Sequence, residues 1–156
     1  MLDRLHPKRI VVVSSSPQVR YPDWYGIDMS RMSEFIAFRA AVELLKSTGR
    51  SNILDQVYND CLVELRKPAN QQVNAVKKIY ENFSDEDISR QIAHMLKPEG
   101  TKAEIKLVYQ TLDGLHNAIP DHPGDWYFSG NYPTPGGVRM VNRAYVNYYE
   151  GKADQR

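Results

Sequence analysis

The sequence predicts a mainly α-helical protein in which a helical bundle follows a single β-strand. The strand is Ile10–Val13, a continuous aliphatic run that Ser14–Ser16 and Pro17 bring to an end. A short run of this kind is typical of a buried strand in a mostly parallel sheet. From Ser30 onward the apolar residues recur at helical spacing, and no second convincing strand follows. Because one strand cannot form a sheet, we expect the chain to begin inside a larger fold.

Two helices are predicted first, each with an apolar stripe that should face a common core. The first starts near Ser30, with Asp28 or Ser30 as its N-cap, and Gly49 follows its end. The second starts at Asn52 and stops before Pro68. The stripes are Met32, Phe35, Ile36, Val42 and Leu45, then Leu54, Val57, Tyr58, Cys61, Leu62 and Leu65.

Three more helices are predicted before residue 120. They open at Asn70, at Ser84 and at Thr101, where Thr101 and Glu104 match a capping box. Their stripes are Val73, Val76, Tyr80 and Phe83, then Ile88, Ile92, Met95 and Leu96, then Ile105, Val108, Tyr109, Leu112 and Leu115.

The last part of the chain should be a loop followed by one helix. Asp121 to Gly137 is rich in proline, glycine and aromatic residues, which is typical of a loop. After it, Val138, Val141, Tyr145 and Tyr149 fit one helical face, which Gly151 ends.

Composition limits the classes of partner. The 156 residues suffice for one domain with a real core, and the formal net charge is only +1. We therefore expect no nucleic-acid partner and no anionic membrane surface. One cysteine excludes a disulfide framework, and no apolar run is long enough to span a bilayer. These features predict a soluble, cytoplasmic protein.

Candidate chemical groups are few, and for each a structural role is the better prediction. The acids Asp85–Asp87 suit the first turn of a helix, and Asp121–Asp125 surrounds a Pro-Gly turn. His94 and His116 have no ligand partner at metal spacing, and Cys61 lies on an apolar stripe. No phosphate-binding glycine motif is present. We predict no catalytic, substrate-binding or metal-ligating residue in this chain.

Two separated segments nevertheless resemble one enzyme family. The first holds Ser16, Pro17, Pro22 and the tetrapeptide Tyr25, Gly26, Ile27, Asp28; the second holds Phe128, Gly130, Tyr132 and Pro133. Together they resemble glutamine phosphoribosylpyrophosphate amidotransferases (amidophosphoribosyltransferases) near their C-terminus, although Gln18 stands where many members have a second proline. Residues 50–123 have no match in that family.

The resemblance implies a fold and a division of the chain. Ile10–Val13 would be the last strand of an α/β type I phosphoribosyltransferase domain, to which residues 1–29 belong. Residues 30–119 would be a helical extension, and residues 120–156 an aromatic loop with a C-terminal helix. The matched residues would have structural roles.

The implied activity is transfer of glutamine-derived ammonia to phosphoribosylpyrophosphate, giving 5-phosphoribosylamine in the first step of purine synthesis. The family uses an N-terminal cysteine nucleophile, and a pyrophosphate loop that follows paired aspartates and works with Mg²⁺. Residue 1 is Met, Cys61 is expected within a helix, and no such loop is present. We therefore expect an inactive C-terminal piece that needs the glutaminase and phosphoribosyltransferase parts as partners, and a homo-oligomer is compatible with this.

Some members of the family hold an iron–sulfur cluster. The positions that match its cysteines are Asp23, Gly124 and Tyr127, none of which offers a thiolate. We expect no cluster here, with Trp126 and Tyr127 filling its volume by aromatic packing.

Two other functions stay open. The helical pattern alone would suit a stand-alone protein-interaction module without enzymatic activity, and another phosphoribosyltransferase relative or regulator is the third reading. In addition, a strand without neighbours exposes its edge, so Ile10–Val13 is expected to drive self-association of the chain on its own.

Overall fold

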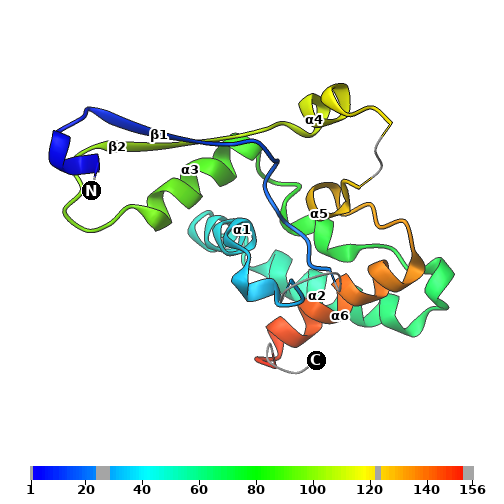
Figure 1. Ribbon diagram of the computed structural model, residues 1–156. Helices are drawn as coiled ribbons and strands as arrows, with labels where there is room; N and C mark the ends of the chain where they lie inside the picture. The colour runs from blue at the N-terminus through cyan, green and yellow to red at the C-terminus, as the bar shows by residue number, and fades with distance from the viewer. Residues whose placement is uncertain (1, 24–28, 122–123, 153–156) are drawn as a thin grey trace.

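The computed structural model describes residues 2–23, 29–121 and 124–152 and shows a mainly helical protein with a small parallel sheet (Figure 1). The strands are β1 (Arg9–Ser14) and β2 (Glu104–Tyr109). The α-helices are α1 (Ile36–Ser47), α2 (Asn52–Arg66), α3 (Asp85–Leu96), α4 (Leu112–Ala118), α5 (Trp126–Ser129) and α6 (Pro135–Tyr149). Short 3₁₀ helices lie at Leu2–Leu5, Met32–Glu34, Ala69–Gln71 and Ala75–Ile79.

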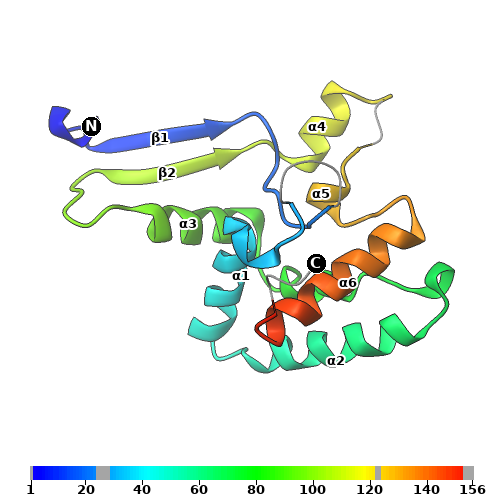
Figure 2. The ribbon, with the colours of Figure 1, turned by 60° about the horizontal axis from the view of Figure 1, so that its bottom comes forward.

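The core lies among α1, α2, α3 and α6. Helix α6 crosses α2, and α3 lies between α1 and the sheet (Figure 2). The predicted stripes of α1, α2, α3 and α6 are confirmed in part, because each helix turns an apolar face inward. Their buried members are Met32, Val42, Leu45, Val57, Cys61, Ile88, Ile92, Val141 and Tyr145, whereas Leu96 and Tyr149 are exposed. Cys61 is fully buried as predicted, whereas Leu62 is half-buried and packs on the edge of the core.

Four of the predicted helix boundaries are confirmed. Helix α2 begins at Asn52, Gly49 after α1 adopts a φ of +72°, and Gly151 after α6 adopts a φ of +69°. Ser84 caps α3 in a full capping box with Asp87. The ends at Ser84, Gly49 and Gly151 were predictable because each depends on a local side chain or on a left-handed residue that favours glycine.

The prediction of a single strand is wrong, because the segment expected to open the fifth helix is β2. Thr101 and Glu104 form no capping box; Glu104 instead pairs with Arg9 of β1 at 2.7 Å. Ile105, Leu107 and Tyr109 alternate with exposed residues and face α3. Parallel pairing with β1 gives backbone amides and carbonyls of this segment hydrogen-bond partners. The segment therefore forms a strand, as its alternating pattern indicates, and not a helix. Helix α4 starts only after Thr111, whose hydroxyl accepts from the Gly114 amide.

The expectation that the first strand is buried is also wrong for this chain. The exposed fractions of Val11, Val12 and Val13 are 51%, 52% and 71%. Helix α3 lies against β2, and β1 extends beyond it with one edge free of any strand in the described part (Figures 1 and 2). Parallel strands are normally covered on both faces, so β1 has the composition of a central strand in the position of an edge strand.

The helix predicted from Asn70 is replaced by two short 3₁₀ helices with an extended link. The amide of Val73 donates to the Glu64 carboxylate at 2.9 Å, and the amide of Ala75 donates to the Asn142 side chain at 3.1 Å. Side chains from α2 and α6 therefore satisfy backbone groups that a continuous helix would have paired internally.

Two further boundaries differ from the prediction. Helix α1 starts at Ile36 rather than near Ser30, since a 3₁₀ turn at Met32–Glu34 precedes it, and Asp28 lies outside the described residues. The predicted loop at 121–137 contains the short helix α5 and the first turn of α6, which Thr134 caps. No helix in residues 2–23, 29–121 and 124–152 combines the length and hydropathy of a membrane span.

Candidate functional site

The described parts of the two segments that carry the family resemblance lie together. The backbone amides of Arg20 and Tyr21 both donate to the carbonyl of Tyr127, at 2.9 and 3.1 Å. The Trp126 indole donates to the Asp23 carboxylate at 2.5 Å, and the Tyr132 hydroxyl donates to the carbonyl of Pro22. We call residues 16–23 together with residues 126–133 the motif junction.

Gly130 is the tightest point of the motif junction. It follows α5 with a φ of +70°, and its carbonyl accepts from the Asn74 side chain at 3.0 Å. A Cβ at this position would lie 2.7 Å from the Tyr21 ring and from Asn74 Nδ2. Both the backbone conformation and the close contact therefore require glycine.

The structure brings some of the predicted motif residues together and leaves others apart. Pro17, Pro22 and Gly130 are buried, Ser16, Phe128 and Tyr132 are half-buried, and Pro133 is exposed. Tyr25, Gly26, Ile27 and Asp28 lie outside the described residues. Among the positions that match cluster cysteines, Asp23 accepts from Trp126, and the rings of Trp126 and Tyr127 stack at 5.7 Å. The two rings thus contact each other, while their replacement of a cluster and the absence of a cluster stay predictions.

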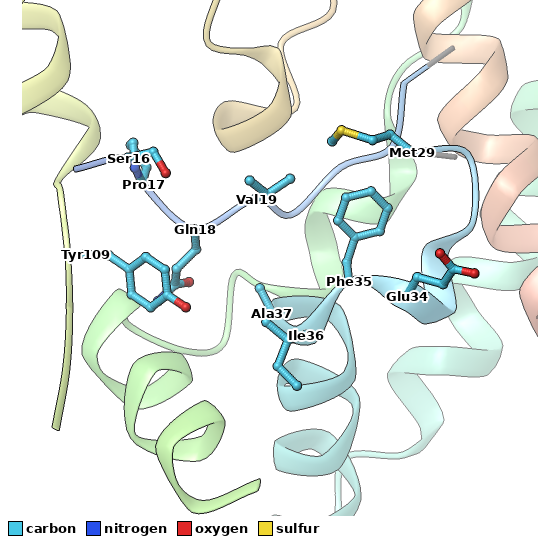
Figure 3. Close-up of a pocket in the computed structure, with 10 residues that line it drawn as sticks. All are labelled: Ser16, Pro17, Gln18, Val19, Met29, Glu34, Phe35, Ile36, Ala37 and Tyr109. Atoms are coloured by element: carbon cyan, nitrogen blue, oxygen red, sulfur yellow. The ribbon is translucent and has the colours of Figure 1, made fainter. Parts of the chain in front are cut away.

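A groove of about 510 Å³ opens beside the motif junction, between the end of β2 and the start of α1 (Figure 3). It lies beside the carboxyl ends of both parallel strands, which is where open α/β sheets bind ligands. Its lining is mostly apolar, with a hydroxyl from Tyr109 and a carboxylate from Glu34. The other lining residues are Ser16, Pro17, Gln18, Val19, Met29, Phe35, Ile36 and Ala37. Among the described residues that line it, no hydroxyl group is hydrogen-bonded to a base, so the groove offers mainly a surface for apolar contact.

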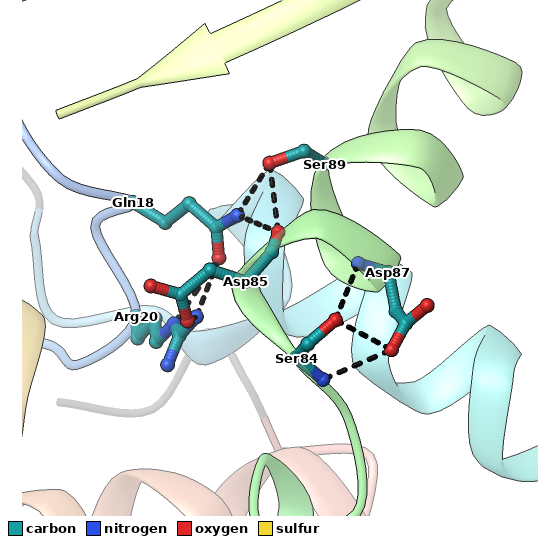
Figure 4. Close-up of polar contacts among 6 residues, drawn as sticks. All are labelled: Gln18, Arg20, Ser84, Asp85, Asp87 and Ser89. Carbon is teal, nitrogen blue, oxygen red and sulfur yellow. Dashed lines mark hydrogen bonds and ion pairs between the residues drawn. The ribbon is translucent and has the colours of Figure 1, made fainter. Parts of the chain in front are cut away.

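A polar cluster that sequence analysis missed ties the motif junction to α3 (Figure 4). The buried Gln18 amide donates to the Asp85 carbonyl and to the Ser89 hydroxyl, both at 2.8 Å. Gln18 Oε1 accepts from Arg20 at 2.8 Å, and Arg20 also pairs with the Asp85 carboxylate. We call Gln18, Arg20, Asp85 and Ser89 the polar clamp. The one sequence signal for it was Gln18 in place of a family proline.

Tyr80 contacts Arg20 of the polar clamp through its ring and its hydroxyl. The guanidinium carbon of Arg20 lies 5.2 Å from the centre of the Tyr80 ring, and the Tyr80 hydroxyl donates to the Arg20 carbonyl at 2.7 Å. Burial raises the pKa of Tyr80 well above its ordinary value, so the hydroxyl keeps its proton for this bond. Arg20 is therefore held by its backbone and by its side chain.

Of the remaining candidates, Asp87 and His116 have structural partners. Asp87 accepts from the Ser84 side chain and amide, and these bonds lower the pKa of Asp87. His116 contacts Asp125 at 3.1 Å on the surface, and His94 is exposed. Within the described ranges no group of three or more His, Cys, Asp or Glu residues is placed to hold a metal ion.

We predict that the Cys61 thiol does not react in the folded protein. It is fully buried, and it contacts Asn142 Oδ1 at 3.5 Å. Burial raises the pKa of Cys61 to about 12, and only a thiolate is a good nucleophile. At pH 8 a thiol reagent such as Ellman's reagent should label it only after the chain is unfolded. Rapid stoichiometric labelling of the native chain would contradict this burial.

No protein-family model, curated protein or solved structure matches this chain.

Proposed function

We propose that the chain is the C-terminal part of an amidophosphoribosyltransferase. In this proposal it works with the glutaminase and phosphoribosyltransferase parts of the same cytoplasmic enzyme, which makes 5-phosphoribosylamine. The cysteine nucleophile, the paired aspartates and the Mg²⁺ that the resembled family uses belong to those other parts. The chain supplies structure to the active site rather than reacting groups.

The observation that carries the proposal is the motif junction. The two resembling segments are more than a hundred residues apart, yet the Trp126 indole reaches Asp23 across a sequence separation of 103 residues. Matches by chance would have no reason to fall on two segments that hydrogen-bond to each other. Their contact supports the view that both were retained as one structural unit of the resembled family.

The exposed sheet supports the same proposal independently. A two-stranded parallel sheet with three exposed valines on one strand leaves apolar surface and backbone groups uncovered. The remaining strands of a phosphoribosyltransferase domain would pair with β1 and bury these valines. Helix α3 belongs to the helical extension and would have a structural role in the enzyme, because the polar clamp joins it to the turn that follows β1.

A chimera tests the proposal. The C-terminal region of a characterised amidophosphoribosyltransferase would be replaced by this chain, joined just after the pyrophosphate loop. We expect the chimera to form phosphoribosylamine, while the host without its C-terminal region and the chain on its own both stay at background.

Two comparisons make the result specific. A chimera carrying Gly49→Ala, a change in a surface turn, should keep its activity, whereas Gly130→Ala should lower it by disturbing the motif junction. A folded chimera without activity would contradict the proposal and favour a stand-alone interaction module. Turnover by the isolated chain would contradict its assignment as a part without reacting groups.

A further inference from the structure

We propose that two copies of the chain pair through the free edge of β1, antiparallel and centred on Val11. This goes beyond the proposed function, because it concerns the 156-residue chain on its own. In the proposed whole enzyme a neighbouring strand would occupy the same edge. The dimer can therefore be absent while the proposed function holds, and the proposed function can be wrong while the dimer forms.

The hydrogen bonds to β2 show which groups of β1 are free. The amide of Glu104 donates to the Lys8 carbonyl at 3.0 Å, and the amide of Gln110 donates to the Ser14 carbonyl at 3.2 Å. In a parallel ladder, alternate residues of a strand face the same neighbour. The even-numbered residues of β1 thus face β2, and the amides and carbonyls of Arg9, Val11 and Val13 point to the free edge.

An antiparallel pair centred on Val11 uses all of these free groups. Val11 lies opposite Val11 of the second copy, and Arg9 lies opposite Val13 in both directions. Each of the three residues then donates and accepts one hydrogen bond, which is the pattern of closely spaced pairs in an antiparallel ladder. A centre on Val12 would leave Arg9 beyond the end of the pair, so Val11 gives the better register.

The side chains of β1 favour this pairing. Val11 and Val13 are exposed on the same face, where Val11 would cover Val11 of the second copy and Val13 would lie opposite the stem of its Arg9. Arg9, the one charged residue of β1, is already paired with Glu104 at 2.7 Å and meets no like charge across the new edge. The edge of β2 is less suited, because Glu104 and Lys106 place charges along it.

Helix α3, which packs against the sheet, leaves room for the second copy. Helix α3 lies against β2 rather than β1 (Figure 2). In the resulting four-stranded sheet the two β2 strands would be three strand spacings apart, about 14 Å. Packed helices need about 8–10 Å between their axes, so the two α3 helices would not collide.

Sedimentation velocity over a wide range of concentrations tests the pairing. We expect a reversible dimer for the natural chain and for Val11→Thr, which keeps the amide. Val11→Pro should be monomeric, because proline removes an edge donor while leaving the bonds to β2 in place. A natural chain that stays monomeric, or a Val11→Pro variant that still forms the dimer, would overturn the proposal.

Amide hydrogen exchange on the natural chain tests the register without any substitution. In the dimer the amides of Arg9, Val11 and Val13 should become protected as concentration rises. The amides of Ile10 and Val12, which face β2, should change much less. A dimer in which the odd-numbered amides still exchange freely would place the contact elsewhere and overturn this assignment.

Discussion

Replacing Asn142 with alanine should destabilise the protein by about 3–5 kcal/mol. Asn142 is fully buried on α6, where its side chain accepts from the Ala75 amide at 3.1 Å and donates to the Val73 carbonyl at 2.9 Å. Alanine would leave both backbone groups without a partner, at about 1–3 kcal/mol each, and would open a small cavity. This is a large share of the stability of an ordinary domain.

Asn59 provides the matched control, since it is an exposed asparagine on α2 whose side chain donates to the Asp55 carbonyl. Asn59→Ala should change the free energy of unfolding by about 0.5 kcal/mol or less. Chemical denaturation of both variants measures the difference. Similar losses for Asn142→Ala and Asn59→Ala would mean that Asn142 does not hold the segment between α2 and α3.

Gly130→Ala should cost about 2–4 kcal/mol, the second largest effect. Alanine at a φ of +70° is strained, and its Cβ would also press on the Tyr21 ring at 2.7 Å. The ring is buried in the core, and the Asn74 side chain on the other side is bonded to the Gly130 carbonyl. Neither neighbour can move without breaking a contact of the motif junction.

Gly49 separates the two contributions to that cost. Its φ of +72° is nearly the same, but nothing lies within 4 Å of the position of a Cβ. Gly49→Ala should therefore cost only the backbone strain, about 1–2 kcal/mol. Equal losses for the two variants in denaturation would contradict the close packing of Gly130.

Local signals account for what the sequence predicted correctly. Helix α3 was predicted because the acids that follow Ser84 suit a first turn, and α6 because Gly151 marks its end. The burial of Cys61 followed from its place on the stripe of α2. Each of these depends on residues a few positions apart, which a sequence pattern can show.

Non-local pairing explains what the sequence did not predict. Residues 104–109 fit a helical spacing through Ile105, Val108 and Tyr109, and an alternating spacing through Ile105, Leu107 and Tyr109. Pairing with β1 determines which of the two spacings the segment follows, and Arg9 of β1 lies 95 residues before its partner Glu104. The polar clamp was missed for the same reason, because Gln18 and Asp85 are 67 residues apart.

A double-mutant cycle on Asp23 and Trp126 is the most direct test of whether the two resembling segments form one unit. The free energy of unfolding would be measured for the natural chain, Asp23→Ala, Trp126→Phe and the double variant. The indole donates to the carboxylate at 2.5 Å, and a hydrogen bond to a charged group is worth about 1.5–3 kcal/mol. We expect a coupling energy of at least about 1 kcal/mol between the two changes. Losses that add to within about 0.5 kcal/mol would show that the segments do not meet.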